Sequence, residues 1–212
     1  MFERIQRTAA PGDSLVNEII RREWQMFDRV QNEGGRAACQ DDAWTFYVMR
    51  YSQFAPLSED VLESYRDDLD QAAREGRNLL FEKYAYMMEY TDPRTFDRTL
   101  KGRIPAISPY KNELVARVAN ALIASEKEFA ACYPKLHQKG RPTEGLNADN
   151  VSAHVYTLGE LKTYSERTLA RYDAHLHARK AQGKENISTA VHRIMVSFYG
   201  YSSLEAAEAR QT

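Results

Sequence analysis

The stretch from Gly34 to Phe54, GGRAACQDDAWTFYVMRYSQF, is predicted to form a helix that carries arginines on its aromatic face. An α-helix turns by about 100° per residue and so sorts its side chains into faces. One face carries Asp41, Asp42, Thr45 and Ser52 and is expected to face water. The other face is expected to point into the protein, and its members are Arg36, Cys39, Gln40, Ala43, Trp44, Phe46, Tyr47, Arg50, Tyr51 and Phe54.

An inward arginine needs a partner, because arginine is almost never fully buried unless its charge is paired. Two alternatives follow for this helix. Carboxylates elsewhere in the chain neutralise the guanidinium groups, or the guanidinium groups bind an anionic ligand, which their planar shape suits. The carboxylates available for internal pairing are Glu23, Glu82, Glu89 and Glu160.

The rest of the chain is divided into helices by apolar periodicity and by capping residues. We expect one domain over residues 1–212, an all-α compact orthogonal bundle of about seven or eight helices. Residues 1–12 are predicted to be a flexible N-terminus, and residues 135–150 a long polar loop. Besides residues 34–54, the predicted helices cover residues 15–31, 59–75, 77–91, 110–133 and 158–180, followed by a helix that ends at Tyr199 and a last short one.

The predicted helix over residues 77–91 is apolar on almost every side, as is typical of a helix in the middle of a fold. Lys83 falls among its apolar residues. Its ammonium group can reach out of the core to water, anchor an anion, or act as a base or nucleophile if its charge is suppressed.

Hydroxyl groups also point inward from the predicted helix over residues 158–180, although most buried hydroxyls simply bond to backbone carbonyls or to one another. The second, fourth and 158–180 helices are therefore expected to surround a polar pocket. Its predicted catalytic residues are Lys83, Tyr84 and Tyr164. Its predicted ligand-binding residues are Arg36, Gln40, Arg50, Arg77, Asn78 and Ser165.

Several classes of site lack their sequence signature. None of the five histidines follows a glutamate at the spacing of a di-iron bundle, and no two histidines are four residues apart as in a zinc helix, so no metal or other cofactor is predicted. The net charge of −1 gives no basic footprint for nucleic acid or an anionic membrane. No apolar run approaches the roughly 18 residues of a membrane span, and no signal peptide is visible, so we expect a cytoplasmic protein.

Four separated runs of residues extend over nearly the whole chain: Glu23-Trp24-x2-Phe27-x2-Val30-x-Asn32-x-Gly34-Gly35-Arg36-Ala37-x-Cys39-Gln40, Met49-Arg50-x-Ser52-Gln53-Phe54, Gly76-Arg77-Asn78-Leu79 with Lys83-Tyr84-Ala85-x-Met87-Met88, and Gly159-Glu160-Leu161-x-Thr163-Tyr164-Ser165. Together they resemble the bacterial family of domains of unknown function numbered 4125. The resemblance implies a compact helical cytoplasmic protein and assigns no activity, cofactor or substrate. The family's motif positions coincide with the inward polar residues.

Two functions are compatible with these observations. The first is a buried Arg/Lys/Tyr pocket for a small anionic metabolite, with a metal-independent lyase, isomerase or hydrolase activity in which Lys83 or a tyrosine moves a proton. The alternative is a non-catalytic helical binding or scaffold module whose buried cations are paired internally. Nothing in the sequence indicates an oligomeric state.

Overall fold

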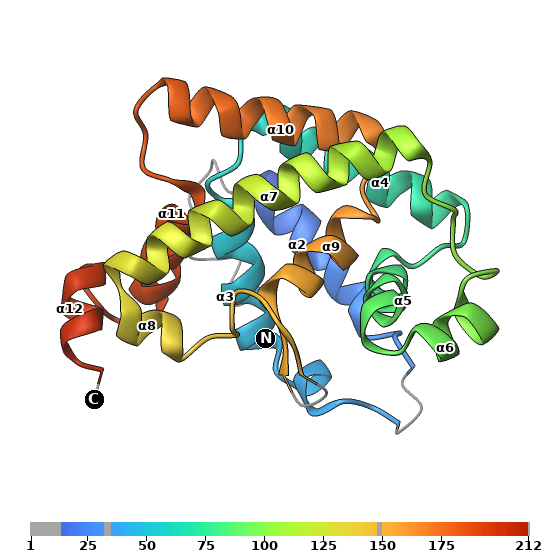
Figure 1. The fold of residues 1–212 in the computed structure, drawn as a ribbon, viewed down its shortest axis with the longest axis horizontal. Helices are drawn as coiled ribbons and strands as arrows, with labels where there is room; N and C mark the ends of the chain where they lie inside the picture. The colour runs from blue at the N-terminus through green and yellow to red at the C-terminus, as the bar shows by residue number, and fades with distance from the viewer. Residues whose placement is uncertain (1–13, 32–34, 148–149, 212) are drawn as a thin grey trace.

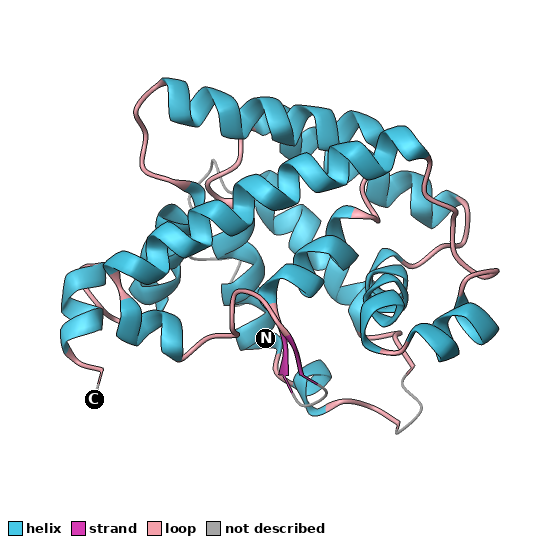
Figure 2. Ribbon diagram, in the orientation of Figure 1, coloured by secondary structure: helices cyan, strands magenta, loops and turns pink. Residues whose placement is uncertain are grey.

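The structure is a computed structural model that describes residues 14–31, 35–147 and 150–211. Most of these residues lie in helices (Figure 2). The described residues form eleven α-helices and one hairpin of two short strands. The predicted all-α class is therefore confirmed, whereas the predicted count of about seven or eight helices is wrong.

The helices differ widely in length. The longer ones are α2 (Ser14–Phe27), α3 (Ala43–Phe54), α4 (Glu59–Arg74), α5 (Leu79–Thr91), α7 (Pro109–Cys132), α9 (Ala153–Leu161), α10 (Glu166–Ala181) and α11 (Ile187–Phe198). The shorter elements are the 3-10 helix η2 (Ala38–Asp41), α6 (Pro93–Thr95), the π-helical turn η3 (Phe96–Leu100), α8 (Pro134–Gln138) and α12 (Leu204–Ala209). Strands β1 (Leu146–Asn147) and β2 (Asn150–Val151) pair antiparallel. The predicted flexible N-terminus, residues 1–12, lies outside the described residues.

Helix α7 crosses the whole molecule, and the other helices are arranged around it (Figure 1). Helix α10 lies along one side of α7 and also contacts α4. Helix α9 packs between α7 and α5, and α11 packs against both α3 and α7. Helices α2, α3, α5 and α9, which come from distant parts of the sequence, thus meet below α7 (Figure 1).

Helix α7 begins within one residue of its predicted start, and several helices begin at a polar side chain that accepts hydrogen bonds from the first backbone N–H groups. Asp92, Ser108 and Asn186 each accept from the backbone N–H three residues later, at the start of α6, α7 and α11. Pro93 and Pro109 occupy the first position of their helices, where no N–H is needed. These starts depend on neighbouring residues alone, which is why local sequence predicts them.

The predicted continuous helix over residues 34–54 is wrong. Among the described residues of this stretch, 38–41 form η2 and α3 starts only at Ala43. Asp42 interrupts the helix because its carboxylate accepts the backbone N–H of Thr45 at 2.9 Å, as an N-cap. Residues before Asp42 therefore do not share the helical faces that the sequence analysis assigned to them.

The predicted helix over residues 158–180 is also interrupted. Helix α9 ends at Leu161, and α10 begins at Glu166 with Ser165 as its cap. Because α9 starts at Ala153, the predicted start at residue 158 lies inside it. The predicted loop over residues 135–150 in fact includes most of α8 and one strand of the hairpin.

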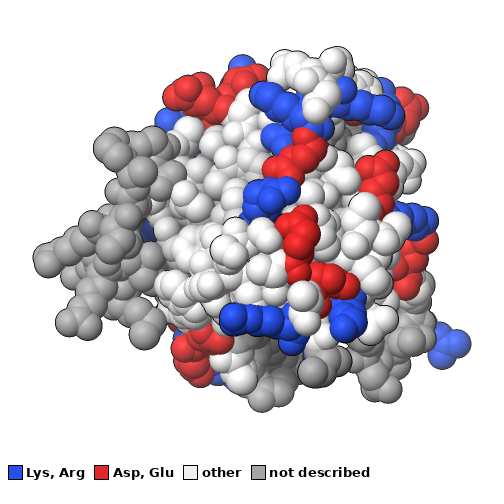
Figure 3. Space-filling view, turned by 90° about the vertical axis from the view of Figure 1, so that its left-hand side faces the viewer, with Lys and Arg blue, Asp and Glu red and all other residues white. Residues whose placement is uncertain are grey.

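The apolar side chains of the long helices form the main core. Ile19, Ile20, Leu114 and Leu169 are fully buried in it. At the surface, the face drawn in Figure 3 shows basic and acidic residues next to one another in a band, with uncharged side chains over much of the rest. No large patch of one sign is visible on this face. No helix of the described residues is long and apolar enough to cross a membrane.

Candidate functional site

A buried arginine and glutamate join α2 to α3. Arg50 Nε donates to Glu23 Oε2 at 2.6 Å, and Arg50 Nη2 donates to Glu23 Oε1. Glu23 is 0 % exposed and Arg50 is 6 % exposed. Tyr65 of α4 donates to Glu23 Oε1 at 2.7 Å. The guanidinium carbon of Arg50 lies 4.5 Å from the ring centre of Phe54, so apolar contacts also surround this charge.

A second carboxylate, from α9, completes the cluster. Arg50 Nη1 lies 3.0 Å from each oxygen of Glu160. Lys83 Nζ donates to Glu160 Oε2 at 2.7 Å, and Tyr164 donates to Glu160 Oε1 at 3.0 Å. We call Glu23, Arg50, Lys83 and Glu160 the charge network. It joins four helices, and its formal charges sum to zero at neutral pH.

The charge network determines the protonation of its members. Burial by itself raises the pKa of Glu160, but Arg50 and Lys83 lower it well below its usual value of 4.5. Burial raises the pKa of Tyr164, and the negative charge of Glu160 raises it further. Burial and the negative charge of Glu23 likewise raise the pKa of Tyr65. Both phenols therefore stay protonated and act as hydrogen-bond donors.

Arg77 and Asn78 lie at the start of α5 and do not join this network. Arg77 Nε and Nη2 each donate to one oxygen of Glu82 at 2.7 Å, and Nη1 donates to Glu75 at 2.9 Å. The bond to Glu82 is the main cause of a raised pKa of Arg77, whose guanidinium thus stays charged. Asn78 caps α5, because its Oδ1 accepts from Leu80 and Phe81. Both residues have intramolecular partners.

Arg36 is exposed, in contrast to the inward position that the sequence predicted. It bonds to Asp41 at 2.8 Å and to Asp28 at 2.6 Å, both on the surface. Gln40 is buried, as predicted, but through another geometry. Its Nε2 donates to the carbonyls of Phe27 and Val30, so this side chain closes the end of α2. Cys39, on the same predicted face, is exposed.

Tyr84 lies at the outer edge of the charge network. Burial raises its pKa, and the nearby phenol of Tyr156 raises it further. The centre of its ring lies 6.4 Å from the centre of the Phe27 ring. Tyr156, on α9, has the guanidinium carbon of Arg141 4.1 Å from its ring centre and Lys83 Nζ 5.6 Å from it.

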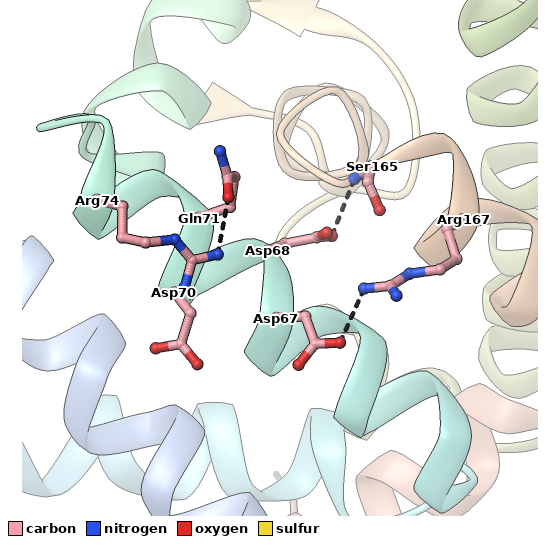
Figure 4. Close-up of a pocket in the computed structure, with 7 residues that line it drawn as sticks. All are labelled: Asp67, Asp68, Asp70, Gln71, Arg74, Ser165 and Arg167. Atoms are coloured by element: carbon pink, nitrogen blue, oxygen red, sulfur yellow. Dashed lines mark hydrogen bonds and ion pairs between the residues drawn. The ribbon is translucent and has the colours of Figure 1, made fainter.

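Ser165 makes no hydrogen bond to the charge network and lies beside a surface cavity of about 450 Å³ (Figure 4). Its backbone N–H donates to Asp68 at 2.9 Å, and its hydroxyl caps α10 through Thr168. The cavity is open and has acidic and basic side chains in its lining, and its other lining residues are Asp67, Asp68, Asp70, Gln71, Arg74 and Arg167. Ser165 thus bonds to Asp68 and Thr168 and not to the charge network.

The structure thus brings together only part of the predicted set: Arg50, Lys83, Tyr84 and Tyr164. Sequence reasoning named Glu23 and Glu160 as possible partners without placing them. It did not nominate Lys162, which is buried and paired with Glu89. It also missed Arg141 and Tyr156, because the first lies in the predicted loop and the second lies outside every predicted helix, where no helical face can be assigned.

No three His, Cys, Asp or Glu side chains of the described residues are grouped so that they could hold a metal ion.

Comparison with protein families gives a single finding. Residues 13–209 match the family described as protein of unknown function (DUF4125). The chain belongs to this family. The match to DUF4125 includes every element from α2 to α12 in full, and hence all of the charge network. No curated protein and no solved structure matches the chain.

Within this DUF4125 chain, two motif positions of the resemblance have a clear physical reason. Gly159 lies where α9 crosses α5, and a Cβ atom there would lie 2.8 Å from the carbonyl oxygen of Lys83 and 2.5 Å from Cγ of Met87. Glycine is therefore required for the approach that brings Glu160 to Lys83. The second position is Gln40, whose buried side chain donates hydrogen bonds to the carbonyls of Phe27 and Val30 at the end of α2. Both positions serve packing.

Proposed function

We propose that the chain is a non-catalytic helical binding module, and that the charge network stabilises it and does not carry out a reaction. One observation carries this proposal. Each cation of the network is matched by a carboxylate of the same chain, Arg50 by Glu23 and Lys83 by Glu160. Arg36 and Arg77, the other cations nominated from the sequence, also have carboxylate partners.

The positions of the four residues support a stabilising role. They come from four helices, and the two carboxylates lie far from each other in the sequence. A buried ion pair contributes little net free energy when it forms, but an alternative packing that separated its members would leave a charge unpaired at a cost of about 3–5 kcal/mol. The network therefore favours one arrangement of α2, α3, α5 and α9 over others.

The catalytic alternative has less support from the same geometry. A general base needs a free lone pair, and an ammonium group that donates to a carboxylate has none. Lys83 is such a group. Tyr164 donates to Glu160 and has a raised pKa, so it is a poor base at neutral pH. A lyase, isomerase or hydrolase reaction would have to begin by breaking these bonds.

The experiment is thermal unfolding of the unliganded wild type and of Lys83→Met. A stabilising network predicts that the midpoint falls by about 5 °C, since Glu160 loses one of its two cations while a chain of this length loses about 2–4 °C per kcal/mol. The matched control is Lys101→Met, which removes an exposed pair with Asp97 and should change the midpoint by less than about 2 °C.

If Lys83 served to bind a ligand, Lys83→Met would have the opposite effect on the unfolding midpoint. Replacing a polar residue of a binding or catalytic site commonly leaves stability unchanged or raises it. A Lys83→Met protein that unfolds at or above the wild-type midpoint would therefore contradict the proposal and favour the anion pocket.

A further inference from the structure

Four side chains lie together at the outer edge of the charge network: Lys83 and Tyr84 of α5, Tyr156 of α9, and Arg141 from the segment between α8 and β1. We call them the outer cluster. Arg141 and Lys83 both lie against the ring of Tyr156, at 4.1 and 5.6 Å from its centre. Tyr84 belongs to α5, which packs against α9, the helix of Tyr156. Three separate segments of the chain thus bring two cations and two phenols to one place.

Hydrogen-bond donors exceed acceptors in the outer cluster. A lysine has three N–H donors and an arginine has five. Among the described residues, Lys83 uses its ammonium group for Glu160 alone, and Arg141 makes one long contact of 3.4 Å to the carbonyl of Val151. The hydroxyls of Tyr84 and Tyr156 have no hydrogen-bond partner among the described residues. A ligand rich in acceptor oxygens would satisfy these groups.

The net charge of these side chains also favours a ligand with acceptor oxygens, namely an anion. The two carboxylates of the charge network offset Arg50 and Lys83. Arg141 adds one positive charge, and it makes no ion pair with any carboxylate that the structure describes. The outer cluster and the charge network together therefore carry one excess positive charge. A singly charged anion would neutralise it.

We propose that the outer cluster binds a small monocarboxylate, and that Arg141 is its principal contact. The two oxygens of a carboxylate match the planar guanidinium of Arg141, and Lys83 has spare N–H donors for the same group. The apolar part of the ligand lies against the ring of Tyr156. This inference rests on the proposed function in one respect only, namely that the ligand is bound and not transformed. Arg141 takes no part in the charge network.

The test is isothermal titration calorimetry of the full chain with acetate and with benzoate at constant ionic strength. Wild type is expected to bind at least one of them saturably, with a dissociation constant below about 10 mM. Arg141→Gln, which keeps a long polar side chain without the charge, is expected to bind at least about tenfold more weakly. The matched control is Arg94→Gln, which removes an exposed arginine of α6 and is expected to bind as the wild type does.

Two further arms identify the ligand chemistry. Inorganic phosphate tests whether another oxyanion binds in place of a carboxylate, and a phosphate that binds more tightly than both carboxylates would overturn the assigned class. Chloride tests for unspecific screening. Equal effects of chloride and carboxylate would overturn the proposal, as would the absence of saturable carboxylate binding by the wild type, unchanged binding by Arg141→Gln, or an equal loss in Arg94→Gln.

Failure here is distinguishable from failure of the proposed function. Arg141 is exposed, so Arg141→Gln without any added anion is expected to unfold within about 2 °C of the wild type. The stabilising role of the charge network is measured in Lys83→Met and does not depend on any added anion.

Discussion

Replacement of Arg50 by methionine should be among the most destabilising changes to the charge network. The substitution removes the guanidinium between two carboxylates and leaves Glu23, which is 0 % exposed, with the hydroxyl of Tyr65 as its remaining donor among the described side chains. Glu160 retains Lys83 and Tyr164. The unpaired charge is thus mainly at Glu23, and leaving a buried charge unpaired costs about 3–5 kcal/mol.

The free energy of unfolding is measured by urea denaturation, together with the thermal midpoint. At about 2–4 °C per kcal/mol, the midpoint of Arg50→Met should fall by about 10 °C. Glu23→Met should cost less, because Arg50 retains both Glu160 and Gln53. The control is Arg36→Met, which removes an exposed arginine and should cost less than about 1 kcal/mol.

The double variant Glu23→Met/Arg50→Met decides whether the reasoning is correct. It removes one positive and one negative charge and leaves Lys83 paired with Glu160. Its cost should therefore be smaller than that of Arg50→Met alone, with a coupling free energy of at least about 2 kcal/mol between the two sites. Additive costs of the two single substitutions would refute the conclusion that these side chains neutralise each other.

Three further outcomes are expected from the same structure. Because the pKa of Glu160 is lowered in the folded state, the ionised carboxylate stabilises the fold above the unfolded pKa of about 4.5, and this stabilisation is lost as the pH falls toward the folded pKa. The difference in unfolding free energy between wild type and Glu160→Gln, measured by urea titration, should therefore shrink below pH 4.5. A difference that grows in acid would contradict this expectation. Gly159→Ala should lower the free energy of unfolding by about 1–3 kcal/mol because its Cβ meets Met87, whereas Gly102→Ala, with no atom within 4 Å, should have little effect. Gln40→Met should cost about 1–3 kcal/mol because it removes one hydrogen-bond donor from each of the carbonyls of Phe27 and Val30, and an unchanged thermal midpoint would show that these two bonds at the end of α2 do not stabilise the fold.

The structure also explains why the predicted pocket set separates into several places. Arg36 and Ser165 were assigned by extending a helical period through Asp42 and through the break between α9 and α10. Once a cap interrupts a helix, the angular relation between residues on its two sides is lost, and with it the predicted common face. Arg50, Lys83 and Tyr84 were assigned within uninterrupted helices, and these predictions of position agree with their burial.

The sequence alone determined the all-α class and several helix starts, because capping and apolar periodicity act over a few neighbouring residues. It also indicated that the arginines of the central helix need partners. Only the tertiary structure decided which partners they have, since Glu23, Arg50, Lys83 and Glu160 meet through the crossing of four helices. The crossing of α5 and α9 depends in turn on the absence of a side chain at Gly159. Such pairings depend on distances between helices, and no local pattern of residues encodes those distances.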